Sequence, residues 1–317
     1  MANETFTLTL DDQGNSVNVT VVDTSQDPPE GNQIFSDVGT HTWTVPSGIT
    51  EISAVAIGGG GGGFGHWDVD ANYLQSARSG NGGDLSYVNS LSVTPGEELT
   101  VVVGAEGQGH SYTAGRFSGP GNQATPGGSS YIQRGTTFLL CARGGSAGSS
   151  VSESNVGDVT YLGGSGANKG GSQNGGPGGG GAAGYAQNGG NGRPGGFSIY
   201  NEPGTTNVIT GGSATGGNGA FGQSSNGSGG GGVGIEGQGN NPPKQSGRGG
   251  SGGSNASGAH GGAYGGGGGG GKTSGGGTGD GGQGAVNIYW GGADFPVPGL
   301  GGGTVTVDSK GSLAIKS

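Results

Sequence analysis

Apolar and polar residues alternate along several short stretches of this chain. Near the N-terminus, Thr5–Leu10 and Ser16–Val22 alternate on either side of a turn-rich break at Asp11–Asn15, which is typical of a β-hairpin. Near the C-terminus, Thr304–Asp308 and Ser312–Ile315 predict a second hairpin. Because a lone two-stranded hairpin is marginal in water, we expect the N-terminal one to dock on a partner or on the main domain.

Further strands are predicted between the two hairpins. They are Gly39–Pro46, Glu51–Ile57, Asp84–Val93, Glu98–Val103, Tyr131–Ala142 and Ala285–Trp290. The second of these is nearly all apolar, as expected of a strand buried on both faces. Asp23–Gln33 reads as a connector, and Pro95-Gly96 as a turn. Helical periodicity is almost absent, so the chain is predicted to be mainly β.

Several predicted strands run directly into glycine-rich sequence, and glycine accounts for 89 of the 317 residues. The richest part extends from Gly163 to Gly284, and a shorter run, Gly58–Gly63, lies near the start. Ordering glycine costs roughly 0.5–1 kcal/mol per residue relative to alanine, so the loss must be offset. Either these segments are linkers, or they pack as extended polyglycine-II helices whose backbones hydrogen-bond laterally.

Two alternatives to the packed helices follow from composition. The glycines keep no strict spacing of three and prolines number only 13, which disfavours a collagen triple helix. Leu, Ile, Val and Phe together fall below the ~20% under which disorder is expected. Single bulky residues interrupt the glycine runs, however, and flexible linkers have little use for them: Tyr185, Phe197, Phe221 and Tyr264.

The charge and the termini exclude several classes of partner. The formal net charge is −10 and the pI is about 4.6, which disfavours nucleic acid and anionic membranes. No apolar run reaches the ~18 residues of a membrane span. The N-terminus has neither a basic start nor an apolar stretch, so no signal peptide is expected. Cys141 is the single cysteine, and no intramolecular disulfide can form.

Motifs of catalysis are weak throughout. Gly266–Thr273 matches the letters of a phosphate-binding loop, but no apolar strand precedes it and no helix can follow it. His66–Asp70 places an imidazole near two carboxylates, but a metal site needs three or four convergent ligands and no further ligand follows at a suitable spacing. Cys141 reads as a small buried residue. We therefore expect no enzyme, no cofactor and no metal.

Recognition chemistry is better represented. Aromatic and histidine side chains gather between the glycine runs, among Ser, Gly and Asn, as in antibody-like binding loops. For any single residue, flanking the glycine lattice is an equally good explanation. As a set, we interpret them as candidate receptor-binding residues: His66, Trp67, Tyr73, His110, Tyr112, Phe117, Tyr161, Phe197 and Tyr200.

Three strings carry a resemblance to a known family. They are Thr42-Trp-Thr-Val-Pro-Ser-Gly-Ile-Thr50 with Ala54–Gly63, Leu91-Ser-Val-Thr-Pro-Gly-Glu-Glu-Leu-Thr-Val-Val-Val-Gly104, and the late glycine run closing on Val286-Asn-Ile-Tyr289. Over roughly 35–290 the chain resembles the glycine-rich domain of bacteriophage tail-fibre and adhesin proteins. The resemblance implies a small β-sandwich-like framework, a body of packed polyglycine-II helices and long loops that face a receptor. Similar domains also occur in some bacterial surface proteins and an animal receptor ectodomain.

Together these observations give a definite expectation. Residues 1–33 form an N-terminal hairpin and connector for attachment or oligomerisation, 34–293 the glycine-rich domain, and 294–317 a C-terminal hairpin tail. The chain is expected to be a non-enzymatic virion protein, a tail-fibre or receptor-binding adhesin made without a signal peptide. Its partners would be other tail or capsid proteins and a bacterial surface polysaccharide or outer-membrane protein. A homotrimer is one candidate for its oligomeric state. The alternative is a structural virion component, capsid-decorating or fibre-shaft, without host contact.

Overall fold

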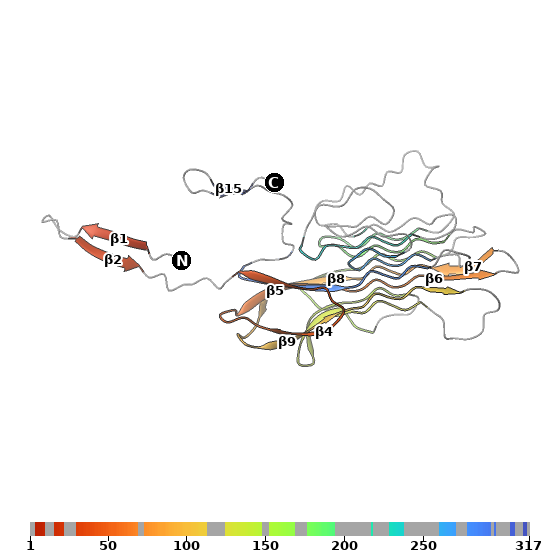
Figure 1. Ribbon diagram of the computed structural model, residues 1–317, viewed down its shortest axis with the longest axis horizontal. Helices are drawn as coiled ribbons and strands as arrows, with labels where there is room; N and C mark the ends of the chain where they lie inside the picture. Colours follow the sequence, from red (N-terminus) through yellow and green to blue (C-terminus); the bar gives the residue numbers. More distant parts are fainter. Residues whose placement is uncertain are drawn as a thin grey trace.

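A computed structural model describes residues 4–9, 16–21, 30–68, 73–112, 124–147, 152–168, 176–193, 217, 228–237, 260–270, 278–292, 295, 305–307 and 313–315. The regular elements of these residues are strands, with no α-helix among them, which confirms the mainly β prediction. No helix in this described part is long and apolar enough to span a bilayer. Two architectures share the main body, a β-sandwich and a lattice of glycine-rich segments (Figure 1).

The sandwich consists of two antiparallel sheets. Along the five-stranded sheet the order is β13 (Val159–Tyr161), β8 (Leu85–Ser92), β5 (Glu51–Ile57), β14 (Ala285–Trp290) and β3 (Gly31–Phe35). Along the four-stranded sheet it is β12 (Thr137–Ala142), β11 (Ser130–Arg134), β9 (Glu98–Val103) and β4 (Gly39–Thr44). Between them lies an apolar core to which Trp43, Leu99 and Ile288 belong, all almost fully buried.

Strand β5 is buried on both faces, as its sequence predicts. Ile52, Ala54 and Ala56 face the core between the sheets. Val55 and Ile57 face a second cluster on the other side of the five-stranded sheet. That second cluster joins the sandwich to the glycine-rich body.

Aromatic residues from the glycine-rich part complete this second cluster. Tyr185 is 1% exposed, donates its hydroxyl to the carbonyl of Gly234 at 2.9 Å and stacks on Phe295. Tyr264 packs against the same cluster, while Phe197 and Phe221 lie outside the described residues. Phe295 was expected to begin the C-terminal tail, but it packs into the main body.

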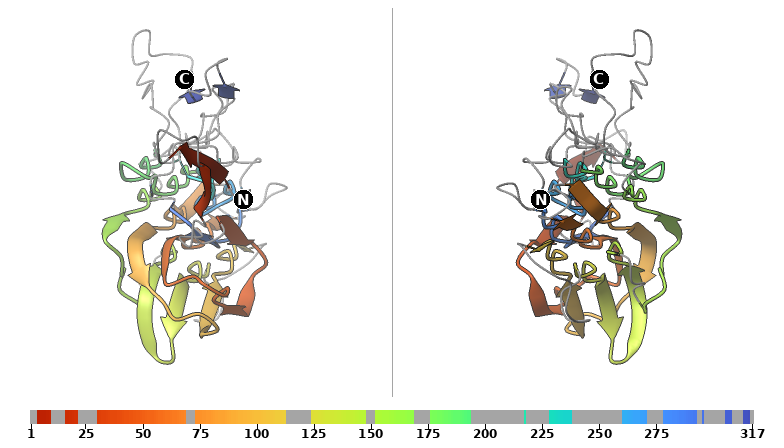
Figure 2. Two further views of the ribbon diagram at one scale, coloured as in Figure 1. Left: turned by 90° about the vertical axis from the view of Figure 1, so that its left-hand side faces the viewer. Right: turned by 90° about the vertical axis from the view of Figure 1, so that its right-hand side faces the viewer.

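The glycine-rich body is built from extended rods, which we name by their residues. They are 58–63, 79–84, 104–109, 124–129, 143–147, 162–168, 177–184, 188–193, 228–233, 260–263, 265–270 and 278–284. Figure 2 looks along the rods and shows them end-on, side by side. Neighbouring rods hydrogen-bond through their backbones without forming ladders of strands.

Rod 58–63 shows the rule that governs this lattice. Its successive N–H groups donate in turn to rods 79–84, 124–129 and 278–284, and the order then repeats, with distances of 2.7–3.0 Å. Its carbonyls accept from three other rods, 104–109, 143–147 and 265–270. A period of three with six bonded neighbours is the geometry of a packed helix with three residues per turn. The expected polyglycine-II packing is therefore present in the described residues.

The same packing explains why the central rod is all glycine. A Cβ atom on any residue of Gly58–Gly63 would lie 2.0–2.3 Å from a backbone carbonyl oxygen of a neighbouring rod. Rod 104–109 lies at the periphery, and there only inward-facing positions such as Gly104 and Gly107 are so constrained, whereas Ala105 and Gln108 are exposed. The period of three is thus visible in the bonding but not in the sequence of the central rods.

Several strands differ from the sequence prediction. Tyr131–Ala142 is not one strand but the hairpin β11–β12, because Gly135 turns the chain with φ +59°. Gly31–Gln33, expected in the connector, pairs with β14 as part of β3. Besides β3, four strands were not foreseen: β6 (Phe64–Asp68), β7 (Tyr73–Arg78), β10 (His110–Tyr112) and β13.

Both terminal hairpins are present as predicted. β1 (Glu4–Thr9) pairs with β2 (Ser16–Val21), and β15 (Val305–Val307) pairs with β16 (Leu313–Ile315), both antiparallel.

Gly61→Ala tests the lattice. Its new methyl group would lie 2.3 Å from the carbonyl oxygen of Ser146, and overpacking of this kind lowers the free energy of unfolding by about 1–3 kcal/mol. The control is Ala105→Gly at an exposed position of rod 104–109, which should lose less than about 1 kcal/mol. Urea unfolding monitors both. Equal losses would show that the rods are not closely packed.

Candidate functional site

Three rods connect the sandwich to a small sheet at the far end of the lattice. Rod 58–63 leads from β5 to β6, rod 79–84 from β7 to β8, and rod 104–109 from β9 to β10. The far sheet has the order β10–β6–β7, with β10 parallel and β7 antiparallel to β6. Figure 1 shows β6 and β7 at one end of the rods and β4, β5, β8 and β9 at the other. We call the far end, with its sheet and the rod ends beside it, the tip.

The tip brings together five of the nine candidate residues. His66 and Trp67 lie on β6, Tyr73 on β7, and His110 and Tyr112 on β10. In the sheet, His66 is opposite Tyr112 and Asp68 is opposite Tyr73. Residues that are far apart in the sequence thus lie on adjacent strands.

The other candidates fall elsewhere. Tyr161 lies on β13, at the sandwich end, where it packs against the second apolar cluster. Phe117, Phe197 and Tyr200 lie outside the described residues.

Other rod ends lie at the level of the tip. Ser79 donates its N–H to Ala167, Gly270 to Pro177, and Gly178 to Arg193, at 2.9–3.1 Å. The described residues that flank 113–123, 169–175 and 271–277 are therefore all near this end of the lattice.

Two polar features mark the described part of the tip. The Nε2 atom of His110 is buried and has no hydrogen-bond partner among the described residues. Asp280 accepts the N–H of Gly109 at 2.6 Å, and its other carboxylate oxygen lies 3.5 Å from Nδ1 of the exposed His260. Such groups supply directional hydrogen bonds for a polar ligand.

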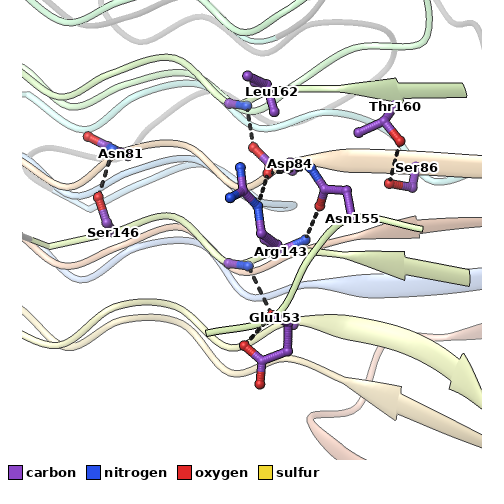
Figure 3. Close-up of polar contacts among 12 residues, drawn as sticks. Asn81, Asp84, Ser86, Arg143, Ser146, Glu153, Asn155, Thr160 and Leu162 are labelled. Atoms are coloured by element: carbon purple, nitrogen blue, oxygen red, sulfur yellow. Dashed lines mark hydrogen bonds and ion pairs between the residues drawn. The ribbon is translucent and has the colours of Figure 1, made fainter. Parts of the chain in front are cut away.

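The densest polar cluster lies at the other end, where the lattice meets the sandwich (Figure 3). The buried carboxylate of Asp84 accepts hydrogen bonds from Arg143, Asn155 and the N–H of Gly163, all at 2.8–2.9 Å. Asn155 also accepts the backbone N–H of Arg143 at 2.8 Å. The cluster joins rods 79–84, 143–147 and 162–168 through these hydrogen bonds, which indicates a structural role.

Asp84→Ala should destabilise the protein. It leaves the guanidinium of Arg143 and the N–H of Gly163 without their acceptor in a partly buried place, at a cost of at least about 2 kcal/mol. Asp84→Asn keeps the volume and one acceptor oxygen, so its loss should be smaller. Chemical unfolding ranks the three proteins, and an Ala variant as stable as the wild type would contradict the structural role.

The catalytic-looking motifs gain no support from the geometry. Within the described residues no group of three or more His, Cys, Asp or Glu side chains could hold a metal. Gly266, Gly267, Gly268 and Gly270 donate their N–H groups to other rods and cannot also cradle a phosphate. Cys141 is fully buried, and burial raises its pKa to about 11.

The Cys141 thiol is expected to be inert in the folded protein. With its pKa raised from 9.0 to about 11, the thiolate fraction at neutral pH is about a hundredfold lower than in the unfolded chain. Because the folded pKa is the higher one, stability is unaffected below pH 9.0 and falls as the pH rises toward about 11. A thiol-reactive dye should label the protein only with denaturant present. Cys141→Ser is the blank, and rapid labelling of the native protein would refute the prediction.

Sequence reasoning missed two features of these sites. The parallel pairing of β10 with β6 joins segments over 40 residues apart, and nothing local in their composition signals it. The role of Asp84 was also missed, although a single carboxylate closing a glycine run at Gly80-Asn-Gly-Gly-Asp84 was a usable signal.

Comparison with known proteins bears on the whole body. No curated protein matches the chain. The family model of the glycine-rich domain matches residues 36–291, from just after β3 to just after β14. The chain therefore belongs to the glycine-rich domain family.

Proposed function

We propose that the protein is a receptor-binding adhesin of a bacteriophage particle, with the tip as its binding surface. The observation that carries this proposal is that the two ends of the body differ: the chain enters and leaves the sandwich at one end, and the tip lies at the other. Strand β14 runs from Gly284 in the lattice to Trp290, which is paired with Gly31. The paired ends Gly31 and Trp290 thus lie at the edge of the sandwich that faces away from the tip.

This difference between the two ends would separate attachment to the virion from recognition of the receptor. In this proposal the terminal segments join other virion proteins and the tip reaches outward. Roughly 20 Å of sandwich strand and roughly 19 Å of rod lie between them. The partner at the tip would be a bacterial surface polysaccharide or outer-membrane protein.

The residues of the tip supply suitable chemistry. His66, Trp67, Tyr73 and Tyr112 lie on three adjacent short strands of the tip, and residues of these types are common in binding surfaces. The protein's net charge of −10 favours recognition through such contacts rather than through attraction to an anionic surface.

Cell binding tests the proposal. Fluorescently labelled protein is titrated onto a panel of bacterial strains, and the triple variant Trp67→Ala, Tyr73→Ala, Tyr112→Ala should bind a receptive strain at least about tenfold more weakly, because binding is concentrated in a few aromatic contacts. The control is Phe138→Ala with Leu162→Ala, two exposed apolar residues away from the tip, which should bind like the wild type.

Each other outcome counts against the adhesin. Equal weakening by both variants would move the binding surface away from the tip. Binding to no strain would favour the alternative, a capsid-decorating or fibre-shaft component, for which the closely bonded rods would supply rigidity alone.

A further inference from the structure

The chain contains Asn-Gly pairs, a dipeptide prone to spontaneous deamidation. They begin at Asn81, Asn174, Asn188, Asn191, Asn218 and Asn226. In this reaction the deprotonated amide nitrogen of the glycine attacks Cγ of the asparagine, which is easiest before glycine because no Cβ obstructs the approach. The N–Cγ bond forms, the Cγ–Nδ2 bond breaks and ammonia leaves. Water then opens the resulting succinimide to aspartate or isoaspartate.

Three of these pairs lie in described rods, and in each the attacking nitrogen is already bonded. Gly82 donates its N–H to the carbonyl of Gly164 at 2.9 Å. Gly189 donates to Leu162 at 2.9 Å, and Gly192 to Ser165 at 2.8 Å. All three acceptors belong to rod 162–168.

The asparagine side chains are held by the same rod. Oδ1 of Asn188 accepts the N–H of Leu162 at 2.9 Å, and Oδ1 of Asn191 accepts the N–H of Ser165 at 2.8 Å. Leu162 and Ser165 therefore each bind both reacting groups of one Asn-Gly pair, three residues apart as the rod geometry requires.

The pair at Asn81 is held in a similar way. Oδ1 of Asn81 accepts the N–H of Gly166 at 2.8 Å, and Nδ2 donates to the hydroxyl of Ser146 at 2.8 Å. Figure 3 shows the second of these contacts. The side-chain amide of Asn81, which carries the electrophilic Cγ, is thus held by hydrogen bonds to two neighbouring rods. The attacking N–H of Gly82 is bonded to Gly164.

We propose that Asn81, Asn188 and Asn191 are latent deamidation sites, which rod 162–168 protects by binding the groups that would react. Asn188 and Asn191 are exposed, so their protection comes from the paired hydrogen bonds and not from exclusion of water. Deamidation at these sites requires the rods to separate. Isoaspartate, once formed, inserts a methylene into the backbone, breaks the repeat of three and prevents the rods from closing again.

Peptide mass spectrometry with isoaspartate detection tests this. The full chain is incubated at mildly alkaline pH, folded and in urea, and the rate at each asparagine is taken as a folded-to-unfolded ratio. We expect all three sites to be slowed at least about tenfold when folded, equivalent to an opening free energy of about 1.4 kcal/mol. Deamidation and amide hydrogen exchange both start from loss of the glycine N–H proton. The slowing of deamidation should therefore follow the hydrogen-exchange protection of Gly82, Gly189 and Gly192. Equal rates in both states, or slowing unrelated to exchange, would overturn the proposal.

A pair of variants separates the rod contacts from general stability. The Cβ of Gly164→Ala would lie 2.0 Å from the carbonyl oxygen of Gly190, which forces rods 162–168 and 188–193 apart. Gly107→Ala makes a similar clash, 2.3 Å from Thr125, in rods that do not bond to 188–193. Deamidation at Asn188 and Asn191 should rise severalfold in the first folded variant and not in the second. A rise in both would refute local protection, and if Gly164→Ala does not fold, the wild-type ratios decide.

Discussion

The fold depends on one constraint: each backbone N–H and C=O of a central rod must find its partner on a different neighbouring rod. An α-helix bonds to itself and a β-strand to two neighbours, but rod 58–63 bonds to six. Such close contact on all sides leaves no space for a Cβ atom. The high entropic cost of ordering glycine is therefore offset by satisfying its backbone in a water-poor interior.

The lattice cannot supply a hydrophobic core, since its rods carry almost no side chains, and the sandwich supplies it instead. Strand β5 serves both parts, with Ile52 facing the inter-sheet core and Ile57 facing Ala182 and Tyr185 of the glycine-rich body. Several rods begin where the strands of the sandwich end, so the register of the sheets sets the position of these rods along their common axis. The carboxylate of Asp84 then ties three rods together at that boundary.

Local patterns predict the parts of this fold that local physics determines. Period-two alternation locates β4, and a short, nearly all-apolar run locates β5. The glycine runs indicate laterally bonded rods once aromatic residues such as Tyr185 argue against a linker. The small sheet at the tip could not be predicted in this way. Its strands β6 and β10 pair because the lattice places rods 58–63 and 104–109 side by side, and rod order depends on contacts between backbones that look alike in sequence. Of the candidate residues, only those that follow these two rods or precede rod 79–84 are brought together.

At the margin of the lattice, side-chain oxygens accept the rod N–H groups that have no backbone carbonyl from a neighbouring rod. Along rod 162–168 the N–H groups of Gly164 and Ala167 donate to backbone carbonyls of rod 177–184. The remaining N–H groups from Leu162 to Gly166 donate instead to side-chain oxygens, from Asn188, Asp84, Asn191 and Asn81. A side-chain oxygen reaches further than a backbone carbonyl, so a rod at the margin can be satisfied across a wider gap. Glycine inside and asparagine or aspartate at the margin are thus two solutions to the same bonding requirement, and the change from one to the other marks the edge of the lattice.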